Sequence, residues 1–88
     1  MKHVGASALA GLAPLRRRLC EETPLVERTP GAFYFKSRAF LHFHEDASGI
    51  IHADVKLDAA AFTRIRATTA AEQARLLALV TGALEPLR

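Results

Sequence analysis

Three of the four histidines in the chain lie in one short stretch together with an aspartate. His42 and His44 are two residues apart, and His52 and Asp54 repeat this spacing after the tripeptide Ala47-Ser48-Gly49. Residues two apart on a β-strand point to the same face, so each pair would present its side chains together. Imidazole and carboxylate groups bind zinc and other divalent transition metals. The spacing therefore predicts a candidate metal site made of His42, His44, His52 and Asp54.

The stretch FLHFHEDASGIIHADVKL, residues 40–57, is typical of a β-hairpin, because two runs of aromatic and branched residues flank a turn that contains glycine. Two residues that oppose each other in an antiparallel pair lie on the same face of the sheet. Most apolar residues of both strands have odd numbers, so they share one face only if the numbers of each opposed pair add up to an even value. A three-residue loop meets this condition. It predicts the pairs Glu45–Ile51, Phe43–Ala53 and Leu41–Val55 on a core face, and His44–His52 and His42–Asp54 on the opposite face.

The histidine-bearing face allows other interpretations. The histidines can form a partly exposed polar face, held by contacts with aspartate or covered by a partner. A nucleic acid could instead stack its bases on aromatic side chains and place its phosphates on cations, although Asp46 and Asp54 weigh against this interpretation. A bound metal ion with an open coordination position could activate water for hydrolysis. The only nearby general base is Glu45, which the predicted register places on the other face.

We therefore expect a binding domain without catalysis of its own and without a cofactor, with zinc or another divalent transition metal as the alternative. Its ligand or partner would contact side chains that point away from the core: Tyr34, Phe40, His42, His44, His52, Asp54, Lys56, Arg64 and Arg66.

The composition sets the class of protein. The chain has 88 residues and a formal charge of +3, which is mildly basic and does not by itself require a nucleic-acid partner. Cys20 is the single cysteine, so an internal disulfide is impossible and a reducing compartment is expected. No run approaches the ~18 apolar residues of a membrane span. The sequence thus predicts a cytoplasmic protein without a membrane partner.

The N-terminal half predicts a helix and two extended segments. Residues 1–6 are expected to form a loose arm, and a helix is expected from about Pro14 to Glu22 because proline is tolerated in the first helical turn. A Thr-Pro pair ends that helix, and residues 25–28 then form a connector or a short edge strand. The alternation in residues 32–36 predicts a strand with Tyr34 on the outer face.

The C-terminal half predicts one more strand and a second helix. Residues 62–67 alternate well enough for a fourth strand that places Arg64 and Arg66 outside. Thr69-Ala70-Ala71-Glu72 matches a capping box, which predicts a helix start. The leucines that follow share one helical face.

This order of elements predicts a single α+β domain over residues 1–88. Three to four antiparallel strands would carry the N-terminal and the C-terminal helix on one face, forming a two-layer sandwich. The other face, here called the open face, would stay uncovered. Tyr34, Phe40 and Ile50 would make it more apolar than a face in water should be. A homo-oligomer or a protein partner is therefore expected, and protonation of the histidines would make the association sensitive to pH.

The pattern FLHFHEDxxGIIHADVKL, followed by a helix that starts with the capping box, resembles the small bacterial luciferase-like domain family. The similarity covers about residues 33–57 and, more loosely, residues 69–80. Members of that family share a strand of the form F-x-H-x-H and a strand of the form G-x-x-H/D-x-x-L, and most have no established activity. The chain lacks the tryptophan of longer members. The order of elements is also similar to that of YjbR-type α+β domains. The positions that match the luciferase-like pattern are His42, His44, Gly49, His52 and Leu57.

Overall fold

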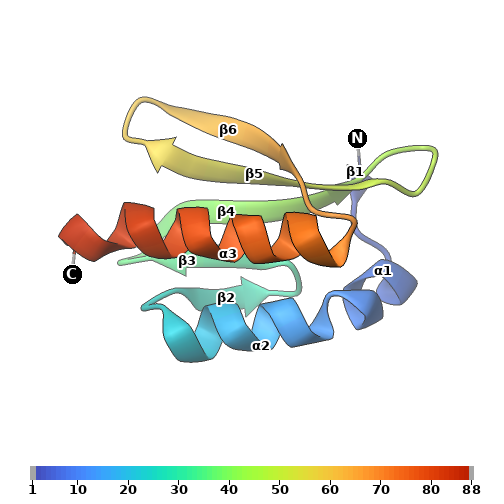
Figure 1. Ribbon diagram of the computed structural model, residues 1–88, viewed down its shortest axis with the longest axis horizontal. Coiled ribbons are helices and arrows are strands. Elements are labelled where there is room, and N and C mark those ends of the chain that lie inside the picture. Colours follow the sequence, from blue (N-terminus) through green and yellow to red (C-terminus); the bar gives the residue numbers. More distant parts are fainter. Residues whose placement is uncertain (1, 88) are drawn as a thin grey trace.

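The computed structural model describes residues 2–87, which form an antiparallel α+β fold in two layers (Figure 1). The elements follow in the order β1 (Lys2–His3), α1 (Ala6–Gly11), α2 (Ala13–Glu22), β2 (Val26–Thr29), β3 (Ala32–Phe35), β4 (Arg38–Glu45), β5 (Ile51–Asp58), β6 (Ala61–Arg66), α3 (Ala70–Leu84) and a 3-10 turn (Glu85–Leu87). The strand order is β2-β3-β4-β5-β6, and β1 pairs with β4. The predicted fold class is confirmed. The expected three to four strands are too few, because β1 and β2 also join the sheet.

The central hairpin has the predicted register. β4 and β5 pair Leu41 with Val55, Phe43 with Ala53 and Glu45 with Ile51, and the two histidine-containing pairs are also as expected. Asp46 closes the loop: its Oδ1 accepts hydrogen bonds from the backbone N–H groups of Ser48 (2.8 Å) and Ile50 (3.0 Å). Gly49 has a φ of +83° in this loop, a conformation that glycine adopts without strain. The residues of the candidate site therefore face away from the core, as predicted: His42, His44, His52 and Asp54.

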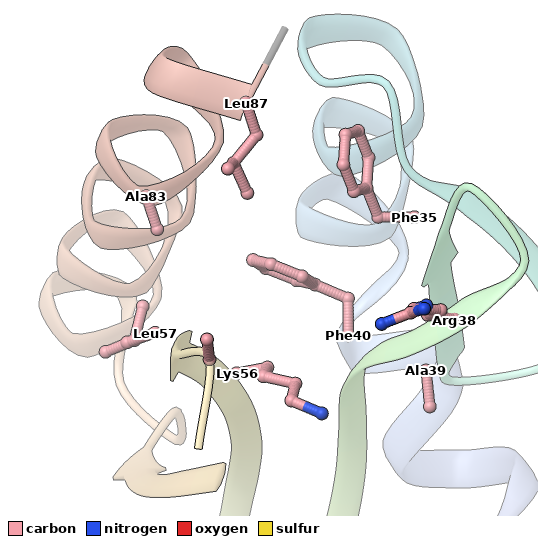
Figure 2. Close-up of a pocket in the computed structure, with 9 residues that line it drawn as sticks. Phe35, Arg38, Ala39, Phe40, Lys56, Leu57, Ala83 and Leu87 are labelled. Atoms are coloured by element: carbon pink, nitrogen blue, oxygen red, sulfur yellow. The ribbon is translucent and has the colours of Figure 1, made fainter. Parts of the chain in front are cut away.

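β4 contains a β-bulge at Phe40. Phe33 pairs with Leu41 but Tyr34 pairs with Ala39, so β4 has one residue more than β3 over this interval. Phe40 and Leu41 are both buried, and Figure 2 shows the Phe40 ring pointing toward the side of α3. The prediction that Phe40 lies on the open face is wrong, because the strict alternation of faces is interrupted at a bulge.

The N-terminal segment is part of the sheet. His3 pairs with His44 on β4, and the backbone N–H of Gly5 donates to Oε1 of Glu45 over 3.2 Å. Val4 is only 7% exposed and belongs to the core cluster. The expectation of a loose arm is therefore wrong for residues 2–6, while Met1 lies outside the described residues. The cause is non-local pairing with β4, which local sequence patterns do not reveal.

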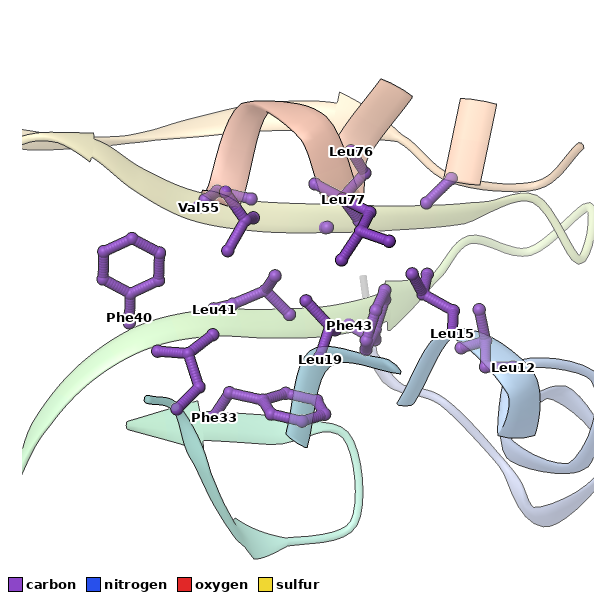
Figure 3. Close-up of a cluster of buried hydrophobic side chains, with 14 of the residues drawn as sticks. Leu12, Leu15, Leu19, Phe33, Phe40, Leu41, Phe43, Val55, Leu76 and Leu77 are labelled. Atoms are coloured by element: carbon purple, nitrogen blue, oxygen red, sulfur yellow. The ribbon is translucent and has the colours of Figure 1, made fainter. Parts of the chain in front are cut away.

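The core lies between the sheet and the helices, which cover the same face of the sheet (Figure 1). α2 begins at Ala13 with Pro14 in its first turn, where the missing N–H costs little. The rings of Phe33 and Phe43 meet edge to face at a centroid distance of 6.1 Å. Figure 3 shows how the buried residues of all layers meet, and the fully buried larger ones are Leu12, Leu19, Phe33, Leu41, Phe43, Val55, Leu76, Val80 and Leu84.

α3 starts at the predicted capping box. The Thr69 hydroxyl accepts a hydrogen bond from the backbone N–H of Glu72 over 3.1 Å. Oε1 of Glu72 in turn accepts from the backbone N–H of Thr69 over 2.9 Å. Because these contacts satisfy amides that a helix start leaves without intrahelical partners, they fix the position at which α3 begins above the sheet.

Candidate functional site

The open face carries most of the residues that the sequence placed there. The alternation along β4, β5 and β6 puts two groups on this face: a polar set and an aromatic set. Tyr34 joins them from β3, where it pairs with Ala39. Phe40 is the exception, as described above. The predicted residues that lie on this face are Tyr34, His42, His44, His52, Asp54, Lys56, Arg64 and Arg66.

Aromatic rings gather around His42. The ring of His44 stacks on it at a centroid distance of 6.1 Å, and the ring of Phe62 meets it edge-on at 6.0 Å. Tyr34 and His3 each lie 6.4 Å from it. His42 therefore sits at the centre of a group of five rings, which we call the aromatic cluster. No helix covers this side of the sheet among the described residues (Figure 1).

Two members of the aromatic cluster were missed from the sequence. His3 is far from the hairpin along the chain and is brought to it by the β1–β4 pairing. Phe62 is 45% exposed and shares its face with Arg64 and Arg66. The same alternation that placed the two arginines outside also places Phe62 there, so the sequence did hold the signal for Phe62. It held none for His3.

Asp54 is engaged by two basic side chains. Its carboxylate accepts hydrogen bonds from Arg64, at 2.8 Å from Nε and 3.0 Å from Nη2. Nε2 of His44 lies 3.2 Å from its Oδ2. The hydrogen bond from Arg64 is the main reason that the pKa of Asp54 is below its usual value, and burial opposes this effect. Asp54 is thus held in its anionic form and occupied by neighbours.

His44 favours its neutral form. Burial lowers the pKa of His44, and the negative charge of Asp54 offsets only part of this effect. Nε2 is placed to donate to Asp54, which makes Nδ1 the acceptor of a neutral ring. Nδ1 of His44 and Nε2 of His42 are both buried, without a hydrogen-bond partner in the described chain. A small cavity of 140 Å³ lies beside them, lined by His42, His44, Asp54 and Phe62.

His52 pairs elsewhere. Its Nε2 lies 3.7 Å from Oδ2 of Asp46, in the hairpin loop. Hydrogen bonding from the backbone N–H of Ile50 is the main cause that lowers the pKa of Asp46. The predicted ligands are thus separated: His44 pairs with Asp54, and His52 pairs with Asp46, which was not a predicted ligand. His42 lies among the aromatic rings. Across residues 2–87, no group of three or more His, Cys, Asp or Glu residues is placed to hold a metal ion. The predicted convergence on one ion is therefore absent from this part of the chain.

The cations of the open face are also largely engaged. Arg64 binds Asp54, and Nε of Arg66 lies 3.1 Å from Oε2 of Glu72. Nζ of Lys56 lies 5.3 Å from the centroid of the Phe62 ring, in a cation–π contact. These partners reduce the positive charge that a nucleic-acid phosphate backbone would meet here.

Comparison of the chain with protein-family models, curated proteins and solved structures gave no match. The resemblances to the luciferase-like and YjbR-type domains thus stay predictions. No helix among residues 2–87 is long and apolar enough to cross a membrane. The class that fold and site define is a two-layer antiparallel α+β domain with an aromatic, histidine-bearing open face.

Proposed function

We propose that the protein is a small binding domain that associates through its open face, with a second copy of the same chain as the partner. The aromatic cluster is the observation that carries this proposal. An antiparallel sheet can leave one face in water when that face is polar. Here the middle of the face is made of rings, and Phe62 is 45% exposed, so covering it removes apolar surface from water.

The charges on the face favour a symmetric pair of copies. In a two-fold interface each surface meets itself, so it must carry groups that complement one another. Arg64 and Lys56 provide positive charge, while Asp46 and Asp54 provide negative charge. The imidazole of His44, whose pKa burial lowers, adds to this complementarity because its neutral ring both donates and accepts a hydrogen bond. A face of this mixture can meet a rotated copy without bringing only like charges together.

Acid should weaken the association. Covering the face desolvates His44 further, and desolvation already lowers its pKa. The monomer then takes up protons more readily than the dimer, so a falling pH favours the monomer. This dependence separates association through the open face from association through the edge strands.

Sedimentation velocity over a concentration series at pH 8 and pH 5.5 tests the proposal. We expect a dimer at pH 8 that dissociates toward pH 5.5. Phe62→Ala should weaken the dimer at least about tenfold, since burial of a phenylalanine contributes about 1.5–3 kcal/mol. Leu87→Ala is the matched control, because Leu87 is also an exposed large apolar residue, at 49%, but lies after α3 on the helix side of the sheet (Figure 2). A wild-type monomer at every pH and up to about 1 mM would overturn the proposal.

A further inference from the structure

We propose a second binding site: the cavity at the C-terminal end of α3 binds an amphipathic carboxylate, a small molecule with an alkyl or aromatic body and one carboxylate group. The cavity has a volume of 380 Å³. This value lies within the range of about 300–1,000 Å³ that is usual for small-molecule sites. Its lining shares no residue with the smaller cavity at the aromatic cluster, and Lys56 is the one open-face residue among those that line it.

The wall of the cavity is mainly apolar. Figure 2 shows Phe40 at its middle, with Leu87 and Ala83 from the C-terminal helical region, Phe35 from β3 and Leu57 from β5 around it. Phe40 reaches this position only because of the bulge in β4, which turns it to the helix side. Leu87 is 49% exposed, so the wall remains accessible to solvent. An alkyl chain or aromatic ring bound here would remove its own apolar surface and that of the cavity wall from water.

The cavity lies where the regular pairing of β4 with β5 ends. Their pairing runs from Glu45–Ile51 to Leu41–Val55 and stops there, although both strands continue. The pairing of β5 with β6 is also irregular between Val55 and Asp58. The regular pairing of β4 with β5 therefore ends next to Phe40, which lines the cavity.

Two cations mark the polar side of the cavity. Arg38 and Lys56 line it, and Figure 2 shows their nitrogen-bearing ends near the gap between β4 and β5. Within residues 2–87, neither has a carboxylate within ion-pair distance. No acidic side chain belongs to the described lining. A site with an apolar wall and two cations that pair with no carboxylate of residues 2–87 complements an anion that has an apolar body, although Lys56 also contacts the Phe62 ring.

A carboxylate suits these groups better than a phosphate. The planar guanidinium of Arg38 can bind a carboxylate with two parallel hydrogen bonds, and Lys56 adds a point charge. Phosphates are commonly held by glycine-rich backbone or helix N-termini. The described lining contains no glycine or hydroxyl side chain, and it meets α3 at its C-terminal end, so it offers no helix N-terminus to hold a phosphate.

Calorimetric titration with decanoate tests the site, with 1-decanol as a probe of equal chain length that lacks the charge. Heteronuclear NMR spectra recorded in parallel should show shifts centred on the amides of Phe40, Ala83 and Leu87. The Arg38→Gln/Lys56→Gln double variant removes both charges. Arg75→Gln is the matched control, because Arg75 is an exposed cation on α3 outside the lining.

We expect decanoate to bind at least about tenfold more tightly than decanol, and the double variant to lose at least about tenfold in affinity, as is usual for a charged hydrogen bond. Arg75→Gln should bind like the wild type. The proposal is overturned if decanoate does not bind, if its shifts centre elsewhere, or if the double variant binds it as tightly as the wild type. Equal binding of decanol and decanoate to the wild type would overturn it too, even if the double variant fails to fold.

Discussion

The carboxylate of Asp54 contacts His44, diagonally across the β4–β5 ladder, rather than His42, the residue that it opposes directly. Arg64 holds the same carboxylate from β6 on the other side. Three neighbouring strands are thus joined by one half-buried anion. His42 is left among aromatic rings, with a buried nitrogen that has no partner in the described chain.

This arrangement predicts a loss of stability in mild acid. Burial lowers the pKa of His44 below its ordinary value of about 6.5, which the unfolded chain keeps. The unfolded chain therefore takes up a proton at this ring more readily than the folded chain does. The free energy of unfolding should therefore decrease as the pH falls below about 6.5. The pKa of Asp54 is lowered, so its contribution is kept above about pH 4 and does not enter this range.

Urea unfolding at pH 7.5 and pH 5.5 checks this prediction, at low protein concentration so that self-association does not contribute. His44→Gln removes the titrating ring but keeps a donor near Asp54. The variant should lose less stability between the two pH values than the wild type does. Equal losses in both proteins would show that His44 is not the group responsible.

The bulge predicts opposite roles for two phenylalanines. Phe40 is 5% exposed in the core, whereas Phe62 is 45% exposed on the open face. Phe40→Ala should reduce the free energy of unfolding by about 3 kcal/mol, the lower end for a buried phenylalanine because a cavity already adjoins it. Phe62→Ala should change the stability of the monomer by less than about 1 kcal/mol. Equal effects in chemical denaturation would contradict the placement of Phe40.

Most of the sheet could be predicted because its strands follow a period of two. The alternation around Phe43 and Ala53 left a single register that keeps apolar side chains together, and that register is observed. The Phe40 bulge breaks the period, and no local signal marks it. The turn before β4 also lacks its usual sequence signal. Lys36 and Ser37 both have positive φ, at 49° and 70°, where glycine or asparagine is usual.

The candidate site was harder to predict than the fold. The alternation along each strand predicts the residues that share a face. It does not predict the residues that contact one another, because these contacts depend on side-chain directions that the sequence does not give. Asp54 was expected to join three histidines, yet Arg64 competes for the same oxygens with a charged, two-pronged contact. His3 enters through pairing between distant segments. Both outcomes depend on three-dimensional proximity rather than on spacing along the chain.

The capping box of α3 predicts that removal of the Thr69 hydroxyl lowers the stability of the protein measurably. Thr69→Ala leaves the backbone N–H of Glu72 without its acceptor and should reduce the free energy of unfolding by about 1 kcal/mol. Ser7→Ala on α1 is the control, because it removes a hydroxyl from another exposed helical position. The control should stay within about 0.5 kcal/mol of the wild type. Thermal and urea unfolding both measure the difference, and a Thr69→Ala protein as stable as the wild type would contradict the assigned cap.

Two glycine-to-alanine substitutions should change the free energy of unfolding in opposite directions. Gly31 has a φ of +81°, and a Cβ there would lie 3.3 Å from side-chain atoms of both Leu9 and Val4. These contacts occur because the N-terminal segment packs over the turn between β2 and β3. Gly31→Ala should therefore lower the free energy of unfolding by more than about 1 kcal/mol, through backbone strain and crowding together.

Gly82 provides the matched opposite case. It lies within α3, and a Cβ there would meet nothing within 4 Å. Gly82→Ala should raise the free energy of unfolding by about 0.5–1 kcal/mol, because alanine loses less backbone entropy in a helix. The sign of the difference between the two variants tests the positive φ of Gly31 together with the packing of the N-terminal segment over this turn. If Gly31→Ala were as stable as Gly82→Ala, the contacts of Val4 and Leu9 with the turn could not be present in solution.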